Sequence, residues 1–215
     1  MLWLESVNAL DLAVRGMVVG IVASAPMGPV GVLTVQRTFN KGRWYGFATG
    51  CGAAVSDLIY AVMTGLGMSF VMDFVERPST IFYLKILGSI LLFLFGAYTY
   101  YTKPAEPHKP SGTRGTLWHN AFTGFAITAS NPLIVFLFLA LFARVGFVVP
   151  DHPVEQTVGY VGVLCGALVW WLCLTTALNR IGSRFEMSTI SLLNRLLGLL
   201  VMVASTVGLF YTLFR

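Results

Sequence analysis

The chain has 215 residues, of which 56% are hydrophobic and only 11% are charged. A soluble domain carries about 25% charged residues, so this composition excludes a soluble globular protein and indicates an integral membrane protein. The net charge of +5 does not indicate nucleic-acid binding, because the basic residues lie in loops between the apolar stretches.

Six transmembrane helices are predicted, and no cleaved signal peptide is expected, because the chain starts with acidic rather than basic residues (Glu5, Asp11). Each apolar stretch reaches the length of about 20 residues that crosses the hydrocarbon core. Two stretches carry one charge each, Asp57 in 44–72 and Lys85 in 81–102. The uncharged stretches are 16–36, 121–143, 157–179 and 196–214.

A break is predicted near the middle of the first helix, at Pro26, Gly28 and Pro29. A proline inside a helix removes one backbone hydrogen bond and clashes with the preceding turn. The freed carbonyl groups need partners in hydrocarbon, so the break is expected to face protein or a watery cavity. Ser24 adds a hydrogen-bonding side chain at the same depth. The alternative is a simple kink that only shapes the helix.

Asp57 is the one acidic residue deep inside a predicted helix. Burial favours its neutral acid, whereas a nearby cation or hydrogen bonds favour the carboxylate. A carboxyl group in this position suits a proton carrier or a counter-ion for an ammonium group. The alternative is a structural carboxyl group bonded to Tyr60 or to an amide of the broken helix. Arg37, at the end of the first helix, is interpreted as part of a cytoplasmic anchor.

A proline-containing segment, 103–116, is interpreted as a linker that divides the chain into two repeats, 1–102 and 117–215. The fourth helix carries a second predicted break at Asn131 and Pro132, with Ser130 beside it. Trp170 and Trp171 fall in the middle of the fifth helix, where they either line a cavity or pack against neighbouring helices.

Short motifs recur in the same order in the two halves. Residues 23–26 match 129–132 at an offset of 106, and residues 85–88 match 195–198 at 110. Residues 51–55 match 165–169 at 114, an offset that pairs Asp57 with Trp171. Three helices per half would make the second copy enter the membrane from the opposite side. The predicted fold is therefore an all-α membrane protein of six transmembrane helices, built as two inverted three-helix repeats with broken helices 1 and 4.

The distribution of basic residues predicts the orientation of the chain. Nine of the lysines and arginines fall in the first, third and fifth loops, and five fall elsewhere. The positive-inside rule places these three loops in the cytoplasm and both termini outside. The expected location is the bacterial inner membrane.

Several motifs together resemble the LysE-type (lysine exporter) amino acid exporter family. They are Gly28-Pro29-Val30, Gln36-Arg37-Thr38, Lys41-Gly42, the run from Gly46 to Asp57-Leu58, Lys85 to Gly88, Asn131-Pro132 with Phe136 to Phe142, and Arg195 to Gly198. The resemblance covers nearly the whole chain. It implies six helices and the export of amino acids or related small solutes, driven by an ion gradient.

The hypothesis from the sequence is a proton-coupled exporter that works by alternating access around a site at the membrane midplane. Alternatives are a thiol–disulfide carrier based on Cys51 and Cys165, a metal-ion exporter, and a membrane scaffold without transport activity. The expected partners are a small amphiphilic solute, the lipid bilayer and, as a candidate, a second copy in a homodimer; no enzyme activity, cofactor, metal or nucleic acid is expected. The predicted site residues are Ser24, Pro26, Gly28, Pro29, Asp57 (also the proton carrier), Ser130, Asn131 and Pro132.

Overall fold

The computed structural model describes residues 8–74, 78–102, 115–149, 151–181 and 187–214, and all regular structure in them is helical. Four of the described helices are long and apolar enough to cross a membrane, and the number rises to six if each of two bent helix pairs is one span. The eight helices are α1 (Ala9–Ser24), α2 (Pro29–Lys41), α3 (Arg43–Phe74), α4 (Pro78–Tyr101), α5 (Leu117–Ala129), α6 (Leu133–Val145), α7 (Pro153–Ile181) and α8 (Met187–Leu213).

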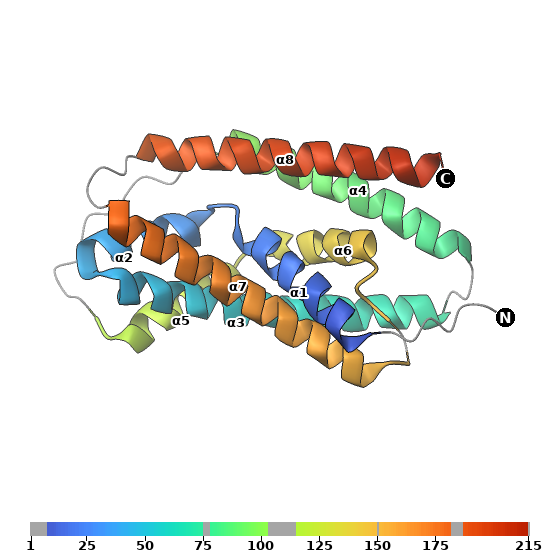
Figure 1. Cartoon of the computed structure of the whole chain (residues 1–215), viewed down its shortest axis with the longest axis horizontal. Helices are drawn as coiled ribbons and strands as arrows, with labels where there is room; N and C mark the ends of the chain where they lie inside the picture. The colour runs from blue at the N-terminus through green and yellow to red at the C-terminus, as the bar shows by residue number, and fades with distance from the viewer. Residues whose placement is uncertain (1–7, 75–77, 103–114, 150, 182–186, 215) are drawn as a thin grey trace.

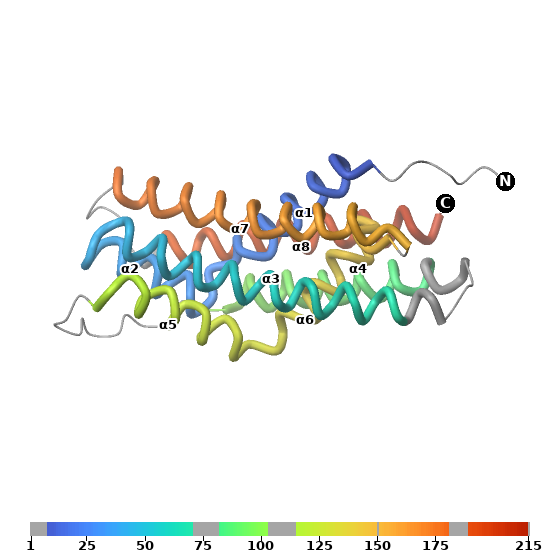
Figure 2. Tube along the Cα trace, turned by 90° about the horizontal axis from the view of Figure 1, so that it is seen from below, coloured from blue at the N-terminus to red at the C-terminus, as the bar shows by residue number. Residues whose placement is uncertain are grey.

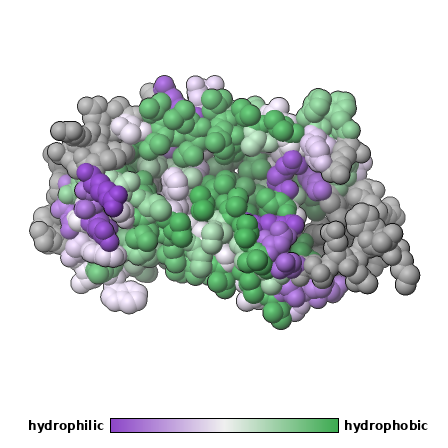
Figure 3. Space-filling view, viewed as in Figure 1, coloured by the Kyte–Doolittle hydropathy of each residue, from purple (hydrophilic) through white to green (hydrophobic). Residues whose placement is uncertain are grey.

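The helices form an elongated bundle in which the chain runs back and forth between two ends (Figures 1 and 2). α1 begins and α8 ends at one end, whereas α2 ends and α5 begins at the other. Apolar residues cover the middle of the face shown in Figure 3, and hydrophilic residues gather near both ends. Large apolar side chains such as those of Leu94 and Leu200 are exposed. This distribution matches a body whose middle lies in hydrocarbon.

Two sharp bends interrupt the bundle, 80° between α1 and α2 and 76° between α5 and α6. α1 ends at Ser24, and α2 begins with Pro29 in its first turn, where the missing proline N–H costs no helical hydrogen bond. The second break is shorter, because α5 ends at Ala129 and α6 begins at Leu133. Asn131 closes a turn onto the carbonyl of Thr128, and its side chain accepts from the Leu133 N–H at 3.2 Å.

The two halves of the chain are interleaved. α1 packs along α7, α5 packs along α3, and α4 packs along α8. Glycines allow the backbones to touch: a Cβ on Gly16 would lie 2.1 Å from the Gly159 carbonyl oxygen, and one on Gly52 would lie 1.8 Å from that of Ala121. In lipid, where no hydrophobic force drives helices together, such close approach supplies the packing energy.

Gly52→Ala is expected to destabilise the protein by about 1–3 kcal/mol or more, because the new methyl group must push α5 away from α3. The midpoint of unfolding by sodium dodecyl sulfate, followed by circular dichroism, measures the loss. Gly67→Ala in the same helix is the control, because a Cβ there meets no atom within 4 Å. Equal midpoints for the two variants would show that the α3–α5 contact is not tight.

The largest apolar cluster fills the bundle around α6. Phe138, Phe142 and Phe147 are all fully buried, and the rings of Phe142 and Phe147 stack with centroids 4.3 Å apart. α6 ends in a left-handed Gly146 (φ 59°), which turns the chain so that Phe147 folds back onto the cluster. Arg15 from α1 donates to the carbonyl oxygens of Val145 and Gly146, at 2.9 and 3.0 Å. This end of the bundle is therefore closed by aromatic packing and a capped helix.

Arg37, interpreted from the sequence as part of a cytoplasmic anchor, is buried inside the bundle. The residue belongs to α2. Its guanidinium Nη1 donates to Thr49 Oγ1 at 2.8 Å and to the Asn120 carbonyl oxygen at 2.9 Å. The residue thus joins α2, α3 and α5. From the sequence alone, a charged residue at the end of a predicted helix is assigned to the adjoining loop, because the hydrophobic pattern does not reveal which other helices cover its side chain.

Candidate functional site

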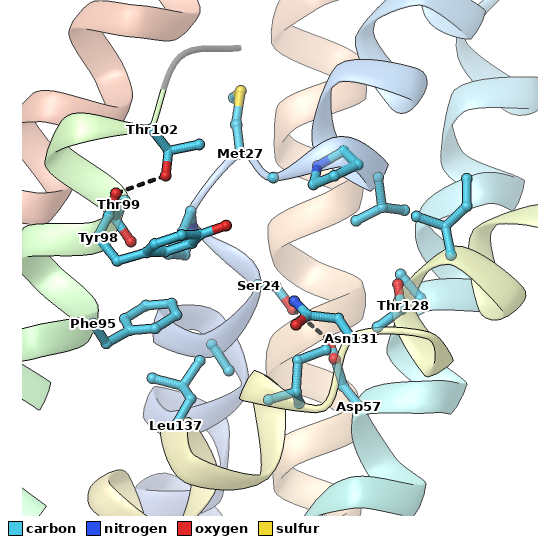
Figure 4. Close-up of a pocket in the computed structure, with 18 of the residues that line it drawn as sticks. Ser24, Met27, Asp57, Phe95, Tyr98, Thr99, Thr102, Thr128, Asn131 and Leu137 are labelled. Carbon is cyan, nitrogen blue, oxygen red and sulfur yellow. Dashed lines mark hydrogen bonds between the residues drawn. The ribbon is translucent and has the colours of Figure 1, made fainter. Parts of the chain in front are cut away.

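A cavity of about 380 Å³ lies between the two bends. The ends of α1, α2, α5 and α6 contribute to its wall, together with side chains from α3, α4, α7 and α8. Figure 4 shows Asp57, Ser24 and Asn131 gathered on one side and the α4 residues Phe95, Tyr98 and Thr99 on the other. The walls are thus polar on one side and largely aromatic on the other.

Most of the site residues predicted from the sequence line this one cavity. They are Ser24, Pro26, Gly28, Pro29, Asp57, Ser130 and Asn131. Pro132 is absent from the lining; it is the N-cap of α6, and its role in the structure is to start that helix. The proline-containing bends bring together residues that are about a hundred positions apart in the chain.

Asp57 projects from α3 into the cavity and is only 7% exposed. Ser24 Oγ, at the last turn of α1, donates a hydrogen bond to Asp57 Oδ2 at 3.2 Å. No lysine, arginine or histidine of the described residues lines the cavity, so no basic side chain there balances this carboxyl group. A carboxyl group in such surroundings can be neutralised by a proton or by a bound cation.

Tyr60 does not hold Asp57, so that alternative from the sequence was wrong. The Tyr60 hydroxyl instead donates to the carbonyl oxygen of Ala129, at 2.6 Å. Ala129 is the last residue of α5, where carbonyl groups lack helical partners. Tyr60 therefore satisfies the broken end of α5 and leaves the Asp57 carboxyl group to Ser24 and the cavity.

Asn194 of α8 fixes the first bend, a role that the sequence analysis missed. The Met27 N–H donates to Asn194 Oδ1 at 2.9 Å, and Asn194 Nδ2 donates to the Met27 carbonyl oxygen at 3.2 Å. Both residues are almost completely buried. One side chain thus replaces two backbone hydrogen bonds that the broken helix loses. An uncharged polar residue in an apolar helix was the available signal.

The α4 wall of the cavity was also missed. Phe95, Tyr98, Thr99 and Thr102 all line it, and the Thr102 hydroxyl donates to the Tyr98 carbonyl oxygen (Figure 4). Of the two tryptophans left open by the sequence, Trp171 lines the cavity, and Trp170 packs against the cluster that contains Ala53 and Ala54.

The cysteines on which the thiol–disulfide alternative was based lie outside the cavity lining. Cys51 is half-buried, Cys165 and Cys173 are exposed, and all three lie outside the cavity lining. Within the described part of the chain, no group of three or more histidine, cysteine, aspartate or glutamate residues is placed to hold a metal ion.

A multi-pass helical membrane protein with a cavity between two bent helix pairs, polar on one wall and apolar on the other, has the architecture of a solute transporter. Residues 21–211 match the family model described as LysE type translocator, and the chain belongs to this family of membrane transporters. The chain is 26% identical over 169 residues to a Bacillus subtilis (strain 168) protein named "Putative amino acid efflux protein YcgF", covering 77% of this chain and 79% of that protein. No solved structure gives a significant match.

Proposed function

We propose that the protein exports amino acids or similar small amphiphilic solutes across the bacterial inner membrane in exchange for protons. The observation that carries this proposal is the single carboxyl group, Asp57, in the cavity between the two bends. The family, and the amino acid efflux named for the Bacillus relative, support the solute class. The volume of about 380 Å³ suits a small molecule.

In the proposed cycle, Asp57 alternates between two partners. Facing the cytoplasm it is ionised, accepts the Ser24 hydroxyl and holds the ammonium group of the solute. Facing outside it takes up a proton, becomes neutral and releases the ammonium group. The neutral acid then returns and loses its proton to the cytoplasm. Each cycle moves one solute out and one proton in, so the inward proton gradient drives export.

Alternating access requires a cavity that is closed on one side at a time. The lining reaches Thr102, at the end of α4 beside the proposed linker 103–116, of which 103–114 lie outside the described residues. The opposite end is filled by Phe138, Phe142 and Phe147. These features support a state open toward the cytoplasm, with the α6 aromatic cluster as the external barrier.

The proposed architecture is six spans in two inverted repeats, 1–102 and 117–215. Matching helix contacts in the two halves support it, because contacts between α1 and α7 recur between α5 and α3. The α5 residue of each contact lies 108 positions after its α1 counterpart, and the α7 residue lies 110 positions after its α3 counterpart. The pairs are Gly16–Gly159 with Gly124–Thr49, and Ala13–Gly162 with Ala121–Gly52. This alignment pairs Asp57 with Ala167 rather than with Trp171, so the carboxyl group stands in one repeat only.

Both termini are proposed to lie outside and the linker inside. A single cysteine at Ser111, in a chain whose native cysteines are replaced, is expected to resist a membrane-impermeant thiol reagent in intact cells and to react after the cells are opened. A cysteine placed at the C-terminus serves as the accessible control. Equal labelling of both positions in intact cells would reverse the proposed orientation.

Transport itself is tested by counterflow in proteoliposomes. Vesicles loaded with a millimolar concentration of one unlabelled amino acid are expected to accumulate the same labelled amino acid transiently, which empty vesicles do not. A panel of the twenty amino acids identifies the solute. The proposal is wrong if none of them produces counterflow with folded, reconstituted protein.

A further inference from the structure

Two buried polar groups on the cavity wall have no hydrogen-bond partner among the described residues. Thr128 Oγ1 belongs to α5, and Trp171 Nε1 belongs to α7. Thr128 is 5% exposed and Trp171 is 2% exposed, and both residues line the cavity. A buried polar group without a partner costs about 1–3 kcal/mol, so such groups at a binding cavity point to a ligand that supplies the missing atom. The indole N–H can only donate, which calls for an acceptor on the ligand.

The start of α2 offers further donors on the same wall. α2 has 13 residues, no side chain caps it, and Gly28, Pro29 and Val30 line the cavity. The first amides of a helix have no partner inside the helix, and the helix dipole gives this end partial positive charge. The first turn of α6 differs, because the Asn131 side chain already accepts from its Leu133 N–H. The open helix start and the donor-only Trp171 indole N–H both favour an anionic acceptor such as a carboxylate, to which the Thr128 hydroxyl can also donate.

The rest of the wall fixes what the solute carries besides its charged groups. Phe95 from α4 and Ile134 and Leu137 from α6 supply an apolar surface. Figure 4 shows Phe95 and Leu137 together, across the cavity from Thr128. Asp57 is the only side chain with a formal charge in the lining given by the described residues. A second positive or negative charge on the solute would therefore be buried without a counter-ion.

Resting on the proposed transport function, we propose that the solute is an amino acid with one ammonium group, one carboxylate and an uncharged apolar side chain. The carboxylate binds the Thr128 hydroxyl, the Trp171 indole N–H and the first turn of α2. The ammonium group binds Asp57 and Ser24, and the side chain lies against Phe95, Ile134 and Leu137. Leucine, lysine and glutamate, which differ in side-chain charge, separate this proposal from general amino acid export.

The first experiment measures how unlabelled amino acids compete with labelled leucine in the counterflow assay. Leucine and phenylalanine are expected to compete at least tenfold better than lysine or glutamate. Counterflow of lysine or glutamate that equals or exceeds that of leucine would overturn the inferred side-chain class and leave the export function standing. Absence of counterflow with every amino acid would remove both.

The second experiment tests the carboxylate contact in purified protein, by competition with labelled leucine in detergent. Leucinol, which has the ammonium group and side chain of leucine without its carboxylate, is expected to bind about tenfold or more weakly than leucine. Thr128→Val keeps the shape and removes the hydroxyl group. It is expected to weaken leucine binding about tenfold and to leave leucinol binding unchanged. A purely structural role for Thr128 predicts equal losses for both ligands, which would overturn the assignment.

Thr123→Val is the matched control for this variant, because Thr123 lies on the same helix and bonds only to carbonyl oxygens of its own helix. The proposed contact with the solute side chain is tested by a second pair of variants, Phe95→Ala and its control Phe93→Ala. Phe95 lines the cavity, whereas Phe93 faces outward from the same helix. Phe95→Ala is expected to raise the KM for leucine about tenfold relative to that for alanine, and Phe93→Ala is expected to leave the ratio unchanged. An unchanged ratio in Phe95→Ala would overturn the proposed side-chain contact.

Discussion

Asp57→Asn is expected to abolish the coupling of solute movement to the proton gradient. In proteoliposomes that are acidic inside, with the membrane potential clamped at zero, a one-for-one exchange accumulates solute by up to about tenfold per pH unit. The asparagine side chain keeps the shape and can still pair with Ser24, but it cannot take up or lose a proton. The accumulation ratio in this variant is therefore expected to fall to about one.

Exchange without a gradient then separates two roles of the carboxyl group. The proposed cycle, in which Asp57 also holds the ammonium group, predicts that counterflow fails in Asp57→Asn as well. Counterflow that survives in this variant would show that Asp57 carries only the proton. Asp11→Asn is the control, because Asp11 is exposed and pairs with Arg15 near the start of α1. Accumulation by Asp57→Asn at the wild-type ratio, with normal expression, would show that the carboxyl group is structural.

Asn194→Ala is expected to have the largest effect on stability among changes at the cavity. It leaves the Met27 N–H and carbonyl group buried without partners, at a cost of about 1–3 kcal/mol each. The total loss of about 2–6 kcal/mol should appear as a lower midpoint of unfolding in sodium dodecyl sulfate. Solute affinity should fall too, because the first bend positions the start of α2 in the cavity.

Asn194→Asp makes this test specific. The aspartate carboxyl group still accepts from the Met27 N–H, and in its protonated form its O–H can donate to the Met27 carbonyl oxygen, so a smaller loss than in Asn194→Ala is expected. Asn179→Ala, at an exposed position near the end of α7, is the control. Equal unfolding midpoints for Asn194→Ala and Asn179→Ala would mean that the bend does not depend on the Asn194 side chain.

The helices and bends follow from local chemistry, which is why the sequence predicts them. Pro26, Pro29 and Pro132 cannot continue a helix, and the structure bends where they stand. The membership of the translocator family is likewise confirmed, because ordered motifs along the chain carry it. Six spans, the inverted repeat and the roles of the individual residues stay predictions.

The remaining features depend on contacts between distant segments, which no local pattern reveals. Phe93 and Phe95 are two positions apart in an apolar helix, and only the packing of α4 makes one face outward and the other face the cavity. Arg37 and Asn194 are polar residues whose partners lie on other helices. Tyr60 was one of two candidate partners for Asp57 in the alternative reading, but its hydroxyl donates to the carbonyl oxygen of Ala129 on α5.

The interleaving of the two halves has a consequence for biosynthesis. α1 leaves the ribosome long before α7, whose backbone packs against Gly16 and Gly20. α3 is likewise made before its partner α5. Chains dominated by such non-local pairings fold slowly and pass through intermediates. The early helices must therefore persist in the bilayer as inserted but unpaired segments. The cavity is complete only when the last third of the chain has been made, because Trp171 and Asn194 belong to its wall. A nascent chain truncated before α7 therefore lacks a complete solute cavity.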